Sequence, residues 1–324
     1  MARSTDGEQR GTGAVRHLIH RPRSWLHPVP PGPGIEEEFV LAGALPTAHP
    51  LFDDGPGRHH DLQTTAEMVR EAGEFIGHTH FGVPSARVGI FYRFELRAGD
   101  LTHWRVGRAP AQLDLELRVR PDKVVDDVPR VLDFRIAPRI DDVPCGNGSA
   151  SLVFLAPVVH HSHRERSRAA VLAAAGREGP GRLPDAPVDP GDVGRGSPDN
   201  VLLHRPEVPG HGRLSAEVRL PPVWSSGDAE GEPAPARALL EALRQTALLA
   251  AGHAYALKPA HSTLASLRVH FRGYAEPDLP MRCTAVWDRL GKDEEGRRTV
   301  PVGLSLIQAD RAVLEATASV VEDL

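Results

Sequence analysis

The stretch that decides the fold is Asp61–His80, with the sequence DLQTTAEMVREAGEFIGHTH. It contains no proline, and its apolar residues recur at the spacing of one helical face. That face consists of Leu62, Ala66, Val69 and Ile76, with Gly73 at the remaining position. A glycine there would let another part of the chain approach closely. The stretch therefore predicts a helix that is largely covered by other parts of the protein. Gly82 and Pro84 are expected to end this helix.

Runs of alternating apolar and polar residues follow this helix. In Ala111–Val119 (AQLDLELRV) the leucines and the valine share one face, and the charged residues take the other. This period of two is typical of a half-buried strand. Further strands are predicted at residues 88–96, 131–137 and 150–159. The first half is thus predicted to be one helix followed by an antiparallel sheet.

The second half repeats this order of signals. A largely apolar helix is predicted at residues 235–256, which contain ARALLEALRQTALLAAGHAYA, and Lys258 and Pro259 close it. Strand-like runs follow at residues 266–274, 281–288, 299–308 and 312–321. A buried helix followed by several antiparallel strands, found twice, predicts an α+β fold made by duplication.

The segment between the halves is dense in Gly, Pro and Asp. Residues 176–196 (GREGPGRLPDAPVDPGDVGRG) can hardly form a helix or a central strand, so they are predicted to be a linker. The expected organisation is a disordered leader at residues 1–14, a first repeat at 15–175, the linker, and a second repeat at 197–324.

Composition excludes several classes of protein. The 324 residues carry a net charge of −5 with scattered basic residues, which argues against nucleic-acid binding. The two cysteines, Cys145 and Cys283, form no CxxC pair, so a reducing compartment is expected. No run has the length of a signal peptide or of a membrane helix. We therefore expect a cytoplasmic protein with no membrane association.

Motifs for metals, cofactors and nucleophilic serines are also missing from the sequence. It has no helical His pair with an intervening Glu, no GxGxxG that opens a helix and no GxSxG elbow. The cluster His160, His161 and His163 precedes an Arg-rich helix and is expected to be an exposed turn. No metal and no cofactor are predicted.

Several short segments carry a resemblance to a known family. In the first half they are Leu18-Ile19-His20-Arg21, His49-Pro50, His60-Asp61, Ala66-Glu67-Met68-Val69-Arg70 and Phe81-Gly82-Val83-Pro84. In the second half they are Val193-Gly194-Arg195, Asp199–Leu203, Leu239-Leu240-Glu241-Ala242 and Arg244-Gln245. Together they resemble the A-factor synthase family, tandem hotdog proteins of γ-butyrolactone biosynthesis. The resemblance implies a tandem hotdog fold, in which each repeat is a central helix wrapped by a curled antiparallel sheet.

The resemblance also implies an activity. The family's enzymes move a β-ketoacyl group from acyl carrier protein onto the hydroxyl of dihydroxyacetone phosphate. The expected partners are therefore an acyl carrier protein or acyl-CoA thioester and a small phosphorylated acceptor. Two alternatives stay open: a dehydratase or thioesterase acting on an acyl carrier substrate, and a non-catalytic acyl-binding or scaffold protein. A monomer that forms an internal pseudo-dimer is expected, or a homodimer.

One segment departs from the family pattern. Family members usually carry a His- and Asp-bearing segment ending in Pro-Gly-Met immediately before the second helix. Residues 222–236 stand in that place and contain no histidine. We therefore expect the site of the second repeat to be altered or inactive.

Acyl transfer needs a base for the attacking hydroxyl and donors for the developing oxyanion. Glu67 lies on the polar stripe of the first predicted helix, and His60 lies at its start. A histidine or a partly buried glutamate can serve as the base. Glu67 and His60 are thus the predicted catalytic pair, and the N–H groups near Leu62–Thr64 are suitable oxyanion donors.

Arg70 has two interpretations. It follows Glu67 at the spacing of a simple surface ion pair, and it could equally hold a phosphate in a bidentate fork. Arg244 is its counterpart in the second repeat. The predicted substrate-binding residues are Arg70, Asp61, His49, Glu241, Arg244 and Gln245.

Overall fold

The computed structural model describes residues 16–21, 36–45, 49, 51–55, 58–107, 109–175, 186–210, 212–221, 224 and 233–324. The main elements of the first repeat are β1 (Arg16–Arg21), β2 (Glu37–Ala44), α1 (Leu62–His80), β3 (Val88–Ala98), β4 (Gln112–Val125), β5 (Val128–Ile140), β7 (Gly146–Leu155) and α2 (Pro157–Ala175). Those of the second are β8 (Leu203–Gly210), β9 (Arg213–Val218), α3 (Ala236–Tyr255), β10 (Ser262–Phe271), β11 (Met281–Trp287), β13 (Arg298–Gln308) and β14 (Arg311–Glu322). Short elements are β6 (Val143–Pro144), β12 (Gly291–Lys292), η2 (Leu101–Trp104), η3 (Pro190–Val193), η4 (Pro198–Asn200) and η6 (Pro259–His261).

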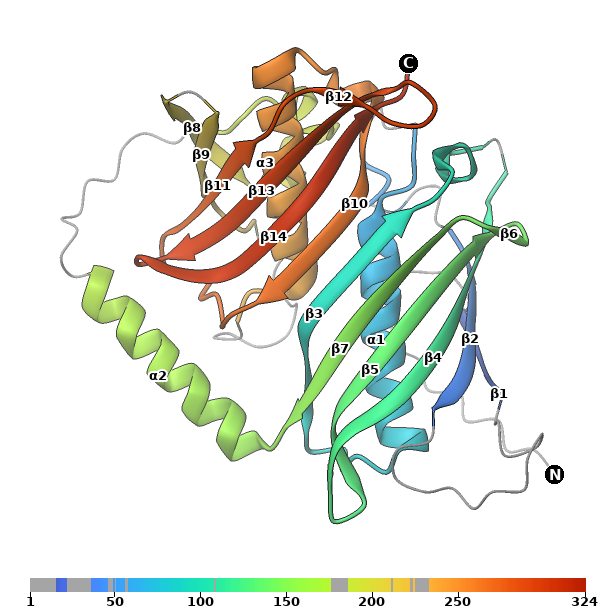
Figure 1. Ribbon diagram of the computed structural model, residues 1–324. Coiled ribbons are helices and arrows are strands. Elements are labelled where there is room, and N and C mark those ends of the chain that lie inside the picture. Colours follow the sequence, from blue (N-terminus) through green and yellow to red (C-terminus); the bar gives the residue numbers. More distant parts are fainter. Residues whose placement is uncertain are drawn as a thin grey trace.

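The strands of both repeats form one antiparallel sheet. Its order is β1-β2-β4-β5-β7-β3-β10-β14-β13-β11-β9-β8, so β3 and β10 join the repeats at the middle. In that seam Phe94 lies opposite Val269, and Leu96 lies opposite Leu267. Each half of the sheet curls around one helix, α1 in the first repeat and α3 in the second (Figure 1). This arrangement confirms the predicted α+β duplication.

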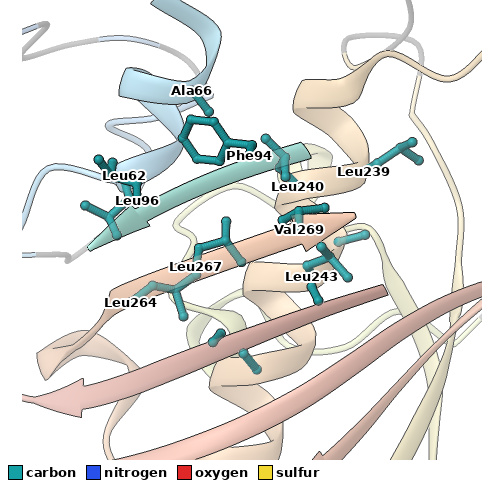
Figure 2. Packing of buried hydrophobic residues seen from close by; sticks show 14 of the residues in the cluster. Leu62, Ala66, Phe94, Leu96, Leu239, Leu240, Leu243, Leu264, Leu267 and Val269 are labelled. Carbon is teal, nitrogen blue, oxygen red and sulfur yellow. The ribbon is translucent and has the colours of Figure 1, made fainter. Parts of the chain in front are cut away.

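A single hydrophobic core crosses the seam. Leu62 and Ala66 of α1 pack beside Phe94 and Leu96 of β3 (Figure 2). The same cluster continues into the second repeat through Leu239, Leu240 and Leu243 of α3 and Leu264, Leu267 and Val269 of β10. The repeats therefore do not fold around separate cores. None of the helices in the described part of the chain is long and apolar enough to cross a membrane.

The structure adds strands that the sequence did not predict. β1 and β2 precede α1, and β8 and β9 precede α3. β8 contains Pro206 and Pro209, which cannot donate ladder hydrogen bonds, and it lies at the end of the sheet order, where proline is tolerated.

The strand predicted at residues 150–159 ends at Leu155, because Pro157 begins α2. The expected turn at His160–His163 was wrong, since these residues belong to α2.

The described part of the predicted linker is packed structure. Residues 186–196 contain η3, and Val193 and Arg195 are buried. Asp189 caps η3, and Gly194 ends it in the left-handed conformation that favours glycine. Residues 176–185 of the predicted linker and the predicted leader at residues 1–14 lie outside the described residues.

The close approach expected of a helical glycine occurs mainly at Gly77, one turn after Gly73. A Cβ at position 77 would lie 2.3 Å from the Phe154 ring, whereas one at position 73 would lie 3.0 Å from Phe134. Phe154 belongs to β7 and is almost fully buried. The glycines therefore bring α1 down onto the aromatic side chains of the sheet.

We predict that Gly77→Ala lowers the free energy of unfolding by about 1–3 kcal/mol, because the added methyl group overpacks the contact with Phe154. Chemical denaturation of the purified variant measures this change. Phe154→Leu in the Gly77→Ala background should recover part of the loss by making room. A Gly77→Ala protein more stable than the wild type would contradict this packing.

Candidate functional site

The two central helices run in opposite directions and meet through their N-terminal halves (Figure 1). Gln63 Nε2 of α1 donates to the carbonyl oxygen of Leu240 in α3 at 3.0 Å. Each helix carries the pair Glu-x-x-Arg, Glu67 with Arg70 and Glu241 with Arg244. Because the helices are antiparallel, each pair faces the N-terminal end of the opposite helix. The chain therefore builds two composite sites, and each takes residues from both repeats.

The first composite site lies at the N-terminal end of α1 and contains four charged side chains, Asp61, Arg195, Glu241 and Arg244, here called the buried ion cluster. Arg195 donates to Glu241 Oε1 and Oε2 at 2.8 and 2.7 Å, and its Nη2 reaches Asp61 Oδ2 at 2.9 Å. Arg244 Nε donates to Asp61 Oδ1 at 3.0 Å. Two carboxylates thus balance two guanidinium groups inside the protein.

Neighbouring polar groups complete the cluster. Arg244 also donates to the carbonyl oxygens of Val193 and Gly194. Gln245 Nε2 donates to Glu241 Oε1 at 2.7 Å, and Gln245 Oε1 accepts the backbone N–H of Leu202. Such full pairing is what buried charges need, because an unpaired one would be strongly destabilising. The cluster therefore joins α1, α3 and the loop after η3.

The charges of the cluster shift the pKa values of Asp61 and Arg195. Burial raises the pKa of the Asp61 carboxyl, but Arg244 and Arg195 outweigh that effect and hold the pKa below its usual value. Burial likewise lowers the pKa of Arg195, and Glu241 and Asp61 outweigh it, so the net change is upward. Asp61 and Arg195 therefore stay charged near neutral pH.

His49 lies in the loop before α1. Its Nδ1 accepts the backbone N–H groups of Leu51 and Phe52 at 3.0 and 3.2 Å, and its ring stacks on Phe52. Among the predicted substrate-binding residues, the structure brings Asp61, Glu241, Arg244 and Gln245 together in and around the ion cluster. His49 organises its own loop, and Arg70 lies in the second composite site.

His60 immediately precedes Asp61 and is 4% exposed. Its Nε2 has no hydrogen-bond partner among the described residues. Burial is the main cause that lowers the pKa of the His60 imidazole; Asp61 opposes it, and His59 adds to it. The ring is therefore neutral near pH 7. No hydrogen bond between His60 and Glu67 is found in the described residues, because Asp61 has an extended backbone and His60 lies outside the helical register.

The second composite site is an open cavity of about 770 Å³ between the repeats. The first repeat contributes Glu67 and Arg70 of α1 together with parts of β3, β7 and α2. The second contributes the N-terminal end of α3, from Pro235 to Arg237, and the loop after β10. In Figure 1 the cavity lies where α2, the start of β3 and the end of β10 approach one another.

The cavity combines apolar walls with a positively charged lining. Its apolar side chains include Phe91, Val153, Leu155, Leu239 and Phe271. Four arginines line it, Arg70, Arg237, Arg272 and Arg311, against one carboxylate, that of Glu67. An apolar chain with an anionic end group fits such a lining, because the walls exclude water and the arginines attract the anion.

Glu67 forms a two-pronged ion pair with Arg70, with distances of 2.8 and 3.0 Å. Its side chain is 12% exposed, and that of Arg70 is 29% exposed. Burial lowers the pKa of Arg70, but the bonds to Glu67 outweigh it, so the net change is upward. The ion-pair interpretation of Arg70 is therefore confirmed, and the pair lies on the wall of the cavity; phosphate binding by Arg70 stays a prediction.

The sequence reasoning missed the part of this site that the second repeat supplies. Pro235, Ala236, Arg237, Tyr274 and Arg311 all line the cavity, and none was a predicted site residue. The sequence feature that could have indicated this contribution was the Glu-x-x-Arg pair that both helices carry. Two such helices facing each other would place each pair at the opposite helix start.

Comparison with known proteins agrees with this architecture. Residues 181–321 match the A-factor biosynthesis hotdog domain family. This part of the chain is similar to that family. A 2-oxo-3-(phosphooxy)propyl 3-oxoalkanoate synthase from Streptomyces coelicolor is 27% identical over 84% of this chain and 82% of its own length. The enzyme of the same name from Streptomyces griseus is 27% identical over 86% of each chain.

Solved structures support the hotdog fold of the chain. The 12:0-ACP thioesterase from Umbellularia californica covers 89% of this chain and 94% of its own, with a TM-score of 0.51 and 10% identity. At that identity the likeness concerns the fold alone. The resemblance and the tandem hotdog fold expected from the sequence are both confirmed.

We predict that Arg195→Met destabilises the protein by about 3–5 kcal/mol, the usual cost of removing one partner from a buried charge network. The change leaves the fully buried Glu241 and the buried Asp61 with Arg244 as their remaining guanidinium. Thermal and urea unfolding measure the loss. Arg268→Met, at an exposed ion pair with Glu95 on the outer face of the sheet, is the matched control and should change little. Equal effects of both substitutions would contradict a structural role for the ion cluster.

We also predict that His60 contributes to acid destabilisation. The pKa of His60 in the folded protein lies below its ordinary value of 6.5, so the unfolded chain binds more protons as the pH falls past that value. Stability should therefore decrease from pH 7 to pH 5. The decrease should be smaller in His60→Gln, which has no titrating group at this position. Urea unfolding at a series of pH values tests this, and identical pH slopes for the two proteins would contradict it.

Proposed function

We propose that this protein is an acyltransferase that moves a β-ketoacyl group from a carrier thioester to the hydroxyl of a small phosphorylated acceptor. The acceptor is dihydroxyacetone phosphate or a close analogue. The name of the curated relatives supports this, because it describes the ester of a 3-oxoalkanoate with a 2-oxo-3-(phosphooxy)propyl group. The observation that carries the proposal is the cavity, whose apolar walls and arginine lining suit an acyl chain and a phosphate together.

The reaction exchanges one bond for another at the acyl carbon. The acceptor hydroxyl attacks the thioester carbonyl, a C–O bond forms, and the C–S bond breaks after the tetrahedral intermediate. The hydroxyl proton moves to a base and then to the departing thiolate. The products are the β-ketoacyl ester and a free carrier thiol, so no oxidant, reductant or metal is needed.

In this proposal Glu67 is the base. Its carboxylate lies on the cavity wall, and its bonds to Arg70 fix its orientation. The N-terminal end of α3 lines the same cavity and carries the partial positive charge of a helix start, which suits the developing oxyanion. His60 lies beside the ion cluster and not among the cavity-lining residues, so the proposal gives it no proton-transfer step.

The proposed donor is an acyl carrier protein, with acyl-CoA as the alternative carrier. Both present the acyl group on a long, thin arm, which suits a cavity that opens at the surface. The proposed location is the cytoplasm, and the product would enter γ-butyrolactone, butenolide or related secondary-metabolite biosynthesis. Because both hotdog repeats lie in one chain, the proposed functional unit is the monomer.

We predict that Glu67→Gln lowers the rate of ester formation by about 10²–10⁴-fold, the usual contribution of a positioned base. Mass spectrometry of the protein incubated with a β-ketoacyl thioester and dihydroxyacetone phosphate measures the ester. Glu207→Gln, an exposed carboxylate that does not line the cavity, is the matched control and should keep its activity.

Three results would contradict the proposal. Unchanged ester formation by Glu67→Gln would remove Glu67 from the chemistry. Free acid or an enoyl product without ester would indicate a thioesterase or a dehydratase. An unaltered thioester that stays bound to the wild-type protein would indicate an acyl-binding role.

A further inference from the structure

The arginines that line the cavity differ in their partners. Arg70 is paired with Glu67, and Arg272 is paired with Glu315 at 2.6 Å. Arg311 Nη1 donates to the hydroxyl oxygen of Ser167 at 2.8 Å. In the described ranges of the chain this neutral hydroxyl is the only hydrogen-bond partner of the Arg311 guanidinium, and no carboxylate lies within ion-pair distance of it. Arg311 is thus a cation at the cavity with no counter-charge among the residues that the structure describes.

The surroundings of Arg311 hold it in one place. A Cβ at Gly273 would lie 2.5 Å from Arg311 Nη2, so the guanidinium lies directly against the backbone of residue 273. Ser167 belongs to α2 and is buried. α2 itself is clamped to the second repeat, because Arg164 and Arg168 bind the fully buried carboxylate of Glu276 at 3.0 and 2.9 Å. The tether of Arg311 is therefore a fixed structural element.

Such an arginine meets the requirements for binding a phosphoryl group. With Nη1 engaged by Ser167, the remaining N–H groups of the guanidinium can form the fork that matches two phosphate oxygens. Preorganisation by Gly273 and Ser167 reduces the entropy lost on binding. The apolar cavity beside it strengthens the attraction, since fewer water molecules screen the charges.

We propose that Arg311 is a binding residue for the phosphoryl group of a substrate at the Glu67 cavity. The proposal rests on the proposed function, in which two substrates carry phosphate. The phosphate of the small acceptor and that of the pantetheine arm of the donor have the same chemistry at this site. Arg311 and Gly273 belong to the second repeat and Ser167 to α2 of the first, so the site combines residues of both repeats.

Two variants test Arg311 in different ways. Arg311→Gln removes the charge. Gly273→Ala keeps Arg311 but places a methyl group where the guanidinium lies, and the flexible end of the arginine can move aside without disrupting the fold. Arg268→Gln, an exposed arginine on the outer face of the sheet, is the matched control.

The measurement is binding by isothermal titration calorimetry, which needs no turnover. One arm compares dihydroxyacetone phosphate with dihydroxyacetone, and the other compares a phosphopantetheine thioester with the unphosphorylated pantetheine thioester. Both test variants should weaken binding of a phosphorylated compound by about tenfold or more, as for the loss of a charge-assisted hydrogen bond. Binding of the unphosphorylated partner and the Arg268→Gln control should not change.

The two arms separate the sources of the phosphate. Weaker binding of dihydroxyacetone phosphate alone supports Arg311 as the acceptor's site, and weaker binding of the phosphopantetheine thioester alone supports it as the donor's. Unchanged affinities in Arg311→Gln, or an equal loss with and without phosphate, would overturn the proposal. Phosphate-dependent binding without any ester product would refute the proposed function and leave the phosphate site standing.

Discussion

The antiparallel pairing of β3 with β10 is the constraint on which the rest of the structure depends. It joins the two halves of the sheet, and it sets α1 and α3 beside each other in opposite directions. Each helix start therefore meets the middle of the other helix. Each of the two sites therefore contains residues from both repeats, which meet across the seam between β3 and β10.

The two sites differ because the helix starts differ. Asp61 stands six residues before Glu67, whereas Pro235 stands six residues before Glu241. At the first site Asp61 binds Arg244, and Arg195 bridges Asp61 to Glu241, which produces a closed and neutral cluster. At the second site Pro235 offers no carboxylate, so Arg70 bonds to its own Glu67. The open cavity lies at that second site, and its lining stays positively charged.

This asymmetry changes how the departure from the family pattern is understood. Residues 233–236, at the end of the altered segment before α3, line the cavity that holds Glu67 of the first repeat. The segment that lacks the histidine therefore leads, along the chain, into the cavity that we propose as the active site. The intact His60-Asp61 pair belongs to the buried end, where Asp61 stabilises the interface between the repeats.

Much of the fold could be predicted from periodicity. The helical face of Asp61–His80 and the alternation of Ala111–Val119 each determine an element locally, and both are found in the structure. β1, β2, β8 and β9 were missed, because strands at and near the sheet ends, one of them with two prolines, carry a weak local signal. Arg195 could not be recognised as a buried residue, because its partners lie 46 and 134 positions away. The crossing of the helices depends on the β3–β10 seam, which no local pattern encodes.

We propose that the reaction takes place at the Glu67 cavity and not at the buried ion cluster. The most direct measurement is a crystal structure of the protein with a stable analogue of the donor, a β-ketoacyl chain joined to pantetheine by a thioether or amide. We predict that the chain lies along the cavity wall that includes the stacked rings of Phe91 and Phe271, with its reacting carbonyl between Glu67 and the N-terminal end of α3. An analogue bound at Asp61, Arg195, Glu241 and Arg244, with that cluster opened, would contradict it.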